Sequence, residues 1–274
     1  MTITSRHNPL IKRIQALKDS KTRRREGRFL VEGVRLLEEA LAAGIHLETV
    51  LACPERVESK RAEALLAGLR AKGMTTVFVS EPVLRCVAET ESPQGLVAVA
   101  EQPVAPPLSL WLARTDLLVL GDGIQDPGNV GTLIRSAEAA GAGGVLLSAG
   151  SVYPFGAKVV RASMGSLFRL PVAVLADGGQ ELAAACRASG WQVVVAMPEG
   201  GTPFWQVRLQ GPVLLVLGNE GAGVSTELIR YSTQRAFIPL TAPVESLNVA
   251  VAGAILLFEA VRQRQTAGPL PSGV

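Results

Sequence analysis

Histidine and cysteine are nearly absent from this chain, which has two histidines and three cysteines among 274 residues. The cysteines form no C-x-x-C pair, and neither His7 nor His46 lies in a motif-like cluster. A Cys/His metal site and a His-based catalytic triad are therefore excluded, and we expect no bound metal. An odd number of scattered cysteines also argues against a disulfide framework and favours a reducing cytoplasm.

Long apolar segments are lacking as well. The longest uninterrupted apolar run, residues 249–258, is much shorter than the ~18 residues that a membrane span requires. The sequence starts MTITSRHNPL, which has neither the charged n-region nor the apolar h-region of a signal peptide. We therefore expect a soluble cytoplasmic protein that does not contact a membrane.

Charge is unevenly distributed along the chain. The net charge is +3, but residues 1–35 hold ten Lys/Arg against three Asp/Glu, a net +7, which leaves −4 on the remainder. One interpretation is a solvated basic helix; the concentration of cations in KTRRREGR favours an arm that binds a polyanion. The candidate contacts to that polyanion are Arg6, Lys12, Arg13, Lys21, Arg23, Arg24 and Arg25.

Hydrophobic periodicity divides the chain into two α/β parts. Residues 5–20 show the stripe of an amphipathic basic helix, and the runs RFLVEG, TVLACP, TTVFVS and GLVAVA predict strands separated by helical stretches. Three prolines in EQPVAPPLS predict a short stiff linker. We therefore predict an N-terminal domain over 1–101, a linker over 102–108 and a second domain over 109–274.

The second domain alternates apolar strand-like runs with helical patterns, which indicates a parallel sheet covered on both faces. Ligands bind such sheets at the carboxyl ends of strands. The loops GDGIQDPGNVGTLIR, GNEGAGVS and TAPVESLNVA each follow a strongly apolar run. They match neither nucleotide motif: Asp126 stands where a dinucleotide fingerprint needs its third glycine, and Asn129 where a P-loop needs lysine.

Asparagine is scarce, and its distribution points to the same loops. The chain has four asparagines, of which Asn129, Asn219 and Asn248 fall one in each loop. Each taken alone has an ordinary structural explanation, because Asn129 and either Ser246 or Asn248 could cap helices and Asn219 could form a turn. Three together at the ends of parallel strands favour a shared functional site.

These loops resemble, in order and spacing, the three motifs of the SpoU (TrmH-type) branch of the SPOUT RNA methyltransferases. The first motif matches Asn129 and Arg135 in NVGTLIRSAEAAG, the second matches LGNEGAGVS, and the third matches IPLTAPVESLNVAVAGAILL. The N-terminal part resembles the ribosomal-protein-like RNA-binding module of that family. The resemblance implies an α/β fold: a parallel-sheet SPOUT domain with a C-terminal trefoil knot, preceded by a small α/β RNA-binding domain.

The resemblance also implies a function, the transfer of a methyl group from S-adenosylmethionine to a ribose 2'-hydroxyl. The separate N-terminal module favours ribosomal RNA over transfer RNA as the substrate, and its basic residues become the predicted RNA contacts. Arg135 is the predicted catalytic residue, oriented by Glu220 and Asn129, although a guanidinium with a pKa above ~12 is a poor base. The predicted cofactor-binding residues are Leu217, Gly218, Asn219, Gly221, Ile238, Leu240, Ser246, Leu247 and Asn248.

The last helix, VAVAGAILLFEAV, is apolar on nearly all sides, which favours burial in a subunit interface. The resemblance likewise implies a homodimer, in which Arg135 of one subunit completes the pocket of the other or acts in its own. Three alternatives stay open: a transfer RNA ribose methyltransferase, a base-directed SPOUT methyltransferase, and a non-catalytic RNA-binding protein of the same fold.

Overall fold

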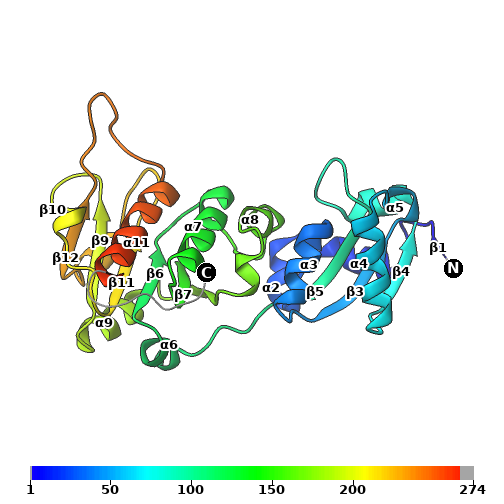
Figure 1. Cartoon of the computed structure of the whole chain (residues 1–274), viewed down its shortest axis with the longest axis horizontal. Helices are drawn as coiled ribbons and strands as arrows, with labels where there is room; N and C mark the ends of the chain where they lie inside the picture. Colours follow the sequence, from blue (N-terminus) through cyan, green and yellow to red (C-terminus); the bar gives the residue numbers. More distant parts are fainter. Residues whose placement is uncertain (1, 266–274) are drawn as a thin grey trace. The chain divides into compact units, whose positions relative to one another are not determined.

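The computed structural model describes residues 2–265, which form two compact units (Figure 1). Unit 1 holds the residues up to Pro103 together with Phe155–Phe168, and unit 2 holds Val104–Pro154 and the described residues from Arg169 onward. The predicted linker at 102–108 stays a prediction. Among the helices of residues 2–265, none has both the length and the apolar character needed to cross a membrane.

Unit 1 is built on a five-stranded mixed sheet of order β1-β4-β3-β5-β2. Strand β5 is antiparallel to β2 and β3, whereas β4 is parallel to β1 and β3. The elements are β1 (Thr2–Ile3), α1 (Pro9–Ala16), α2 (Ser20–Glu26), β2 (Arg28–Glu32), α3 (Val34–Ala42), β3 (Leu47–Ala52), η1 (Pro54–Arg56), α4 (Lys60–Ala71), β4 (Thr76–Val79), α5 (Glu81–Val87) and β5 (Leu96–Glu101). The four predicted strands of this part are confirmed.

The basic segment at the start of unit 1 forms two helices, not the single helix that we predicted over 5–20. Helix α1 ends at Ala16, and Asp19 then caps α2 by accepting a hydrogen bond from the Thr22 amide at 2.8 Å. The run of arginines is therefore helical. An N-cap carboxylate accepts from the first-turn amides, which ends one helix and begins the next within three residues.

One predicted RNA contact, Arg23, has a structural position instead. Its side chain is buried, and its Nη1 donates to the carbonyls of Leu17 and Lys18, both at 2.7 Å. These bonds satisfy carbonyls at the junction of α1 and α2. Lys21 and Arg25 are exposed on the same helix. The sequence pattern could not separate Arg23 from its neighbours, because all of them lie in one cationic run.

A short segment far along the chain completes the core of unit 1. It contains α8 (Ala157–Ala162) and η2 (Ser166–Phe168), and α8 packs against β2. The rings of Phe155 and Phe168 lie 5.2 and 6.2 Å from the ring of Phe29. Periodicity predicted a helix in this segment but not the sheet that it covers, because tertiary contacts decide that.

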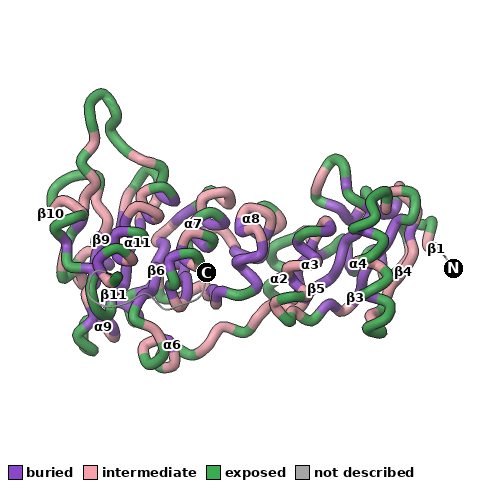
Figure 2. Tube along the Cα trace, viewed as in Figure 1, coloured by how far each residue is buried: buried purple, intermediate pink, exposed green. Residues whose placement is uncertain are grey.

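Unit 2 is built on a seven-stranded sheet of order β10-β12-β9-β11-β6-β7-β8, in which every pairing is parallel. Strands β6, β7 and β11 are buried along their whole length, as Figure 2 shows. The elements are α6 (Leu108–Arg114), β6 (Leu117–Gly121), α7 (Pro127–Ala139), β7 (Gly144–Ser148), β8 (Val172–Leu175), α9 (Gln180–Ala188), β9 (Gln192–Met197), β10 (Thr202–Pro203), η3 (Phe204–Gln206), β11 (Val213–Leu217), α10 (Thr226–Ile229), β12 (Gln234–Phe237) and α11 (Val249–Gln265).

Helices cover both faces of this sheet, as predicted. Trp111 of α6 and Leu182 of α9 pack with Leu118 and Leu120 on one face. Helices α7 and α11 pack together on the other. After β12 the chain therefore returns across the sheet to α7, which follows β6. The predicted C-terminal trefoil knot stays a prediction.

The contact between α11 and the rest of unit 2 depends on Gly253. A Cβ atom at this position would lie 2.7 Å from Leu217 Cδ1 and 2.8 Å from Leu133 Cδ1. Both leucines are buried, so they have little room to move. Glycine therefore sets how closely α11 approaches α7 and the end of β11.

We expect Gly253→Leu to destabilise the chain by about 1–3 kcal/mol, the usual cost of overpacking a core. The matched control is Ala254→Leu, since Ala254 is only half-buried on the same helix. Urea unfolding at neutral pH measures both. Equal free energies of unfolding for the two variants would contradict this account of the α11 contact.

Candidate active site

The three predicted loops begin side by side at the carboxyl edge of the unit 2 sheet. Strands β6 and β11 are paired so that Gly121 lies opposite Leu217. The next residue, Asp122, donates its amide hydrogen to the Leu217 carbonyl at 2.8 Å. The parallel topology therefore places the first and second loops in contact, and the third loop follows β12 on the far side of β9.

Asn219 folds the second loop and joins it to the first. Its backbone exchanges two hydrogen bonds with Gly223, and its Oδ1 accepts from the amides of Gly221 and Ala222, both at 2.9 Å. Its Nδ2 donates to the carbonyl of Gly123 at 2.7 Å. A Cβ atom on Gly218 would lie 2.2 Å from the backbone carbon of Gly223, so only glycine fits there.

A chain of side-chain hydrogen bonds joins all three loops. Asn248 Nδ2 donates to Asn129 Oδ1 at 2.7 Å, and Asn129 Nδ2 donates to Glu220 Oε1 at 2.8 Å. Asn248 also caps α11, because its Oδ1 accepts from the Ala250 amide at 2.9 Å. The cap of α7 is Asp126, so Asn129 is free of capping and serves the link between the loops.

Glu220 is the acidic end of this chain of bonds. Burial acts to raise its pKa, but hydrogen bonds from Asn129 and from backbone amides, including those of Gln125 and Asp126, outweigh burial and hold the pKa below its ordinary value. The carboxylate is therefore ionised at neutral pH and acts as a hydrogen-bond acceptor within the loops, and its predicted role of orienting Arg135 stays a prediction.

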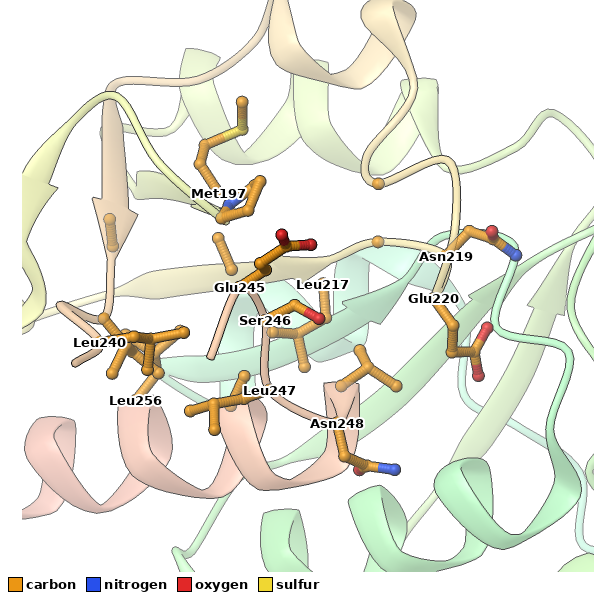
Figure 3. Close-up of a pocket in the computed structure, with 18 of the residues that line it drawn as sticks. Met197, Leu217, Asn219, Glu220, Leu240, Glu245, Ser246, Leu247, Asn248 and Leu256 are labelled. Atoms are coloured by element: carbon orange, nitrogen blue, oxygen red, sulfur yellow. The ribbon is translucent and has the colours of Figure 1, made fainter. Parts of the chain in front are cut away.

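The second and third loops, with the end of β9 and the start of α11, line a pocket of about 580 Å³ (Figure 3). The first loop supplies none of its lining residues and is joined to the other two loops through Asn129. All nine predicted cofactor-binding residues line the pocket, together with Glu220. Gly223, in the second loop, lines it too, and sequence reasoning missed several others, namely Ala196, Met197, Pro198, Ala236, Glu245, Val249, Ala252 and Leu256. Met197 ends β9 and Pro198 follows it, and β9 lies beside β11, so applying the strand-end rule to every strand would have found both.

The pocket combines apolar walls with negative charge. Leu217, Leu240, Leu247 and Leu256 supply apolar surface, as Figure 3 shows, and Glu220 and Glu245 supply two carboxylates. No lysine, arginine or histidine occurs among its lining residues within 2–265. The pocket therefore suits a ligand that has an apolar ring and a positively charged group.

Arg135 does not line this pocket. It is exposed on α7, on the side opposite the buried Val130, Leu133 and Ile134, as its position in the helix predicted. It forms no hydrogen bond or ion pair with any residue that the structure describes. The structure thus brings Asn129 and Glu220 together but leaves Arg135 outside their cluster.

We expect Glu220→Gln to destabilise the folded chain at neutral pH, because a neutral amide accepts these hydrogen bonds less strongly. A lowered folded pKa means that the carboxylate stabilises the fold above the unfolded pKa and loses this effect as pH falls through the folded value. The difference in unfolding free energy between wild type and Glu220→Gln should therefore be constant from about pH 6 to 8 and shrink toward pH 3.

Urea unfolding across this pH range tests that expectation. The control is Glu227→Gln, which changes an exposed carboxylate on α10 whose one hydrogen-bond partner among the described residues is the adjacent Thr226. It should cost less stability at neutral pH than Glu220→Gln. A wild-type advantage over Glu220→Gln that grows in acid would show that Glu220 does not hold the loops as a carboxylate.

Two family models match this chain. The SpoU rRNA Methylase family matches residues 116–258, and the MRM3-like substrate binding domain matches residues 8–98. The 23S rRNA (guanosine(2553)-2'-O)-methyltransferase RlmP of Bacillus subtilis is 36% identical, over 93% of this chain and 97% of its own length. The 23S rRNA (uridine(2479)-2'-O)-methyltransferase of Streptomyces viridochromogenes is 35% identical, over 96% of this chain and 92% of its own.

Solved structures agree with these matches. The SpoU methyltransferase AviRb from Streptomyces viridochromogenes in complex with the cofactor AdoMet superposes with a TM-score of 0.83 at 34% identity, covering 94% of this chain and 98% of its own. The predicted fold class is confirmed, with a mixed-sheet N-terminal domain and an all-parallel SPOUT domain. The predicted resemblance is confirmed too: this chain belongs to the SpoU rRNA methylase family.

Proposed function

We propose that this chain transfers the methyl group of S-adenosylmethionine to a ribose 2'-hydroxyl of ribosomal RNA. The observation that carries the proposal is the pocket, since the second and third motif loops of the family line it and all nine predicted residues are among its lining residues. Both relatives named above are 2'-O-methyltransferases of 23S ribosomal RNA and match nearly the full chain. A tRNA-modifying TrmH/SpoU enzyme of A. aeolicus covers only 59% of it, which favours ribosomal RNA.

The pocket fits S-adenosylmethionine in size and charge. Its volume of about 580 Å³ lies in the range usual for small-molecule sites. Leu240, Leu247 and Leu256 offer apolar surface to the adenine, and Glu220 and Glu245 offer negative charge to the cationic sulfonium and ammonium groups. When bound, S-adenosylmethionine supplies an electrophilic methyl group. AdoMet-bound structures of two relatives at 34% identity support this assignment.

The remaining site residues would position the reactants. Asn129, Glu220 and Asn248 hold the three loops in one arrangement through their hydrogen bonds. Arg135 carries a permanent positive charge and has all its donors available, so it would bind the phosphate beside the target ribose and stabilise the hydroxyl as it loses its proton. A guanidinium rarely gives up its own proton, so its role is electrostatic.

We also propose that the enzyme is a homodimer formed through α11. Val251 and Phe258 are 47% and 51% exposed, and their spacing of seven residues places them on one face of the helix, with Ile255 between them. Exposed apolar residues on one face are typical of an interface. Because Arg135 does not line the pocket of its own chain, it would complete the pocket of the partner.

A reducing, ribosome-containing compartment suits this proposal, and we propose the bacterial cytoplasm. All three cysteines are free thiols. Burial raises the pKa of the Cys53 thiol to about 11 and that of Cys186 to about 12. Thiols with such values are unreactive and serve as small apolar groups in the core.

We expect Arg135→Ala to lower the rate of methyl transfer to bulk ribosomal RNA at least about 100-fold, the usual effect of removing one transition-state donor. Affinity for S-adenosylmethionine should stay within about twofold, since Arg135 lies outside the pocket. Labelled methyl groups in alkali-resistant dinucleotides report ribose methylation. Arg208→Ala removes another exposed arginine of unit 2 as the control and should retain the wild-type rate.

Mixing two inactive variants tests whether Arg135 acts on the partner's pocket. Arg135→Ala keeps an intact pocket, whereas Gly218→Val keeps Arg135 but fills the second loop against Gly223. If Arg135 acts across the dimer, co-expression should restore about a quarter of the wild-type activity, because half of the dimers are mixed and each has one complete site. No recovery in verified mixed dimers would place Arg135 in its own subunit's site.

We expect Phe258→Glu to yield a monomer, because a buried, unpaired charge disfavours an apolar interface. Sedimentation velocity measures the mass, and far-ultraviolet circular dichroism checks the fold. The control is Arg208→Glu, at an exposed position of unit 2 outside α11. A Phe258→Glu variant that still sediments as a dimer would show that the interface lies elsewhere.

A further inference from the structure

Unit 1 contains a second hollow, of about 460 Å³, which lies wholly within the N-terminal domain. Its walls come from the first turn of α3, from η1 and the loop that leads into the first turn of α4, and from the loop before β5. The residues that give it chemical character are Arg35, Arg56, Ser59, Arg61, Ser92 and Gln94. We call this set the arginine hollow. None of its residues belongs to the basic run of α2.

Three guanidinium groups in one concave site point to an anionic ligand. Arg35 is exposed and forms no hydrogen bond or ion pair with any described residue. Arg61 is held by Glu38, which accepts from its Nε at 2.9 Å, and Arg56 is held by Glu81. Each guanidinium has five N–H donors, so these pairs orient it and leave further donors for a ligand. Glu58 is the one carboxylate among the described lining residues.

Two helices begin at the arginine hollow and add to its positive potential. Val34 opens α3, whose N-cap is Gly33 and has no side chain to satisfy the first amides. Helix α4 begins at Lys60, and Ser59 and Arg61 on either side of that start line the hollow. Backbone amides at helix N-termini favour anions, and here they reinforce the three arginines.

The walls of the arginine hollow are fixed to the sheet. Gly95 has φ +85°, and a Cβ atom there would lie 2.8 Å from the backbone carbonyl of Arg56. The Cys53 amide donates to the Gly95 carbonyl at 2.8 Å, and the Gly33 amide donates to the Leu96 carbonyl at 3.1 Å. These contacts hold all three wall segments against β5. The site is thus preorganised for binding.

We propose that the arginine hollow binds the phosphodiester backbone of the RNA substrate, with a phosphate group held by Arg35, Arg56 and Arg61. Paired N–H donors of a guanidinium match the oxygens of a phosphate. The inference rests on the proposed function and assigns its substrate a second contact. Helix α2 precedes β2 and Arg35 follows it, so the two basic sites lie at opposite ends of that five-residue strand, whose length is about 15 Å. One RNA strand can reach both.

Filter binding of the full chain to bulk large-subunit ribosomal RNA, from about 50 to 200 mM salt, tests this proposal. Arg35→Gln should weaken binding about tenfold and reduce the slope of log affinity against log salt by roughly 0.7 to 0.9, the effect of one lost phosphate contact. The double variant Arg35→Gln/Arg61→Gln should reduce the slope about twice as much. The matched control is Lys72→Gln, which removes an exposed cation at the far end of α4.

Wild-type affinity and salt slope in both Arg35→Gln and the double variant would overturn the proposal. So would an equal loss in Lys72→Gln, because the effect would then be general charge and not the hollow. An unaltered far-ultraviolet circular dichroism spectrum and an unaltered urea unfolding midpoint show that the variants are folded. A wild-type chain that binds RNA with the expected salt slope but never methylates it would defeat the proposed function and leave the arginine hollow standing.

Discussion

The candidate active site depends on a series of two side-chain hydrogen bonds, which runs from Asn248 through Asn129 to Glu220. Each of its members comes from a different loop, and the loops are separated by 91 and 119 residues of sequence across the two bonds. A parallel sheet brings the carboxyl ends of its strands to one edge, but it leaves the loops that follow free to vary. The side-chain bonds remove that freedom, and the charge on Glu220 strengthens the terminal bond.

The same hydrogen bonds link the site to the position of helix α11. Asn248 caps α11 with its Oδ1 while its Nδ2 reaches Asn129, so the start of the helix and the assembly of the loops share one side chain. Gly253 then lets α11 approach Leu133 and Leu217, and Leu217 also lines the pocket. Helix α11 reaches this position only after the segment that follows β12 has returned across the sheet. The pocket is therefore complete only when the whole domain has folded.

Much of this site could be predicted from the sequence, because it follows from a topological rule. Alternating strands and helices predict a parallel sheet, and the scarcity of asparagine singled out three of the loops that meet at its edge. Asn219 and Asn248 each have the ordinary structural role of a turn or cap residue, because each accepts hydrogen bonds from nearby backbone amides. Each also joins two loops through its side-chain amide. The prediction used only the loops after the most apolar strands, so it missed Met197, which ends β9, and Pro198, which follows it.

The sequence could not predict which side chains are buried by contacts between separate elements. Arg23 lies in a run of cations whose members are equivalent in sequence, and only the junction of α1 and α2 makes one of them a buried donor to carbonyls. Phe155 and Phe168 lie in a segment whose periodicity predicts a helix but contains no signal for the Phe29 ring that they contact. The partners of Arg23 are backbone carbonyls, which every residue has, and the partner of the two phenylalanines is more than a hundred residues away in sequence. Neither contact can be predicted from a local sequence pattern.

The distribution of charge accounts for how one chain can hold two ligands of opposite sign. The pocket in unit 2 has two carboxylates and, among its described lining residues, no cationic side chain, which favours a sulfonium and would repel a phosphate. The arginine hollow in unit 1 has three guanidinium groups and one carboxylate among its described lining residues, which favours an anion. Arg135 lies outside both sets, where it is exposed and unpaired within the described residues. A cation inside the pocket would oppose the cofactor, whereas one beside it can attract RNA without that cost.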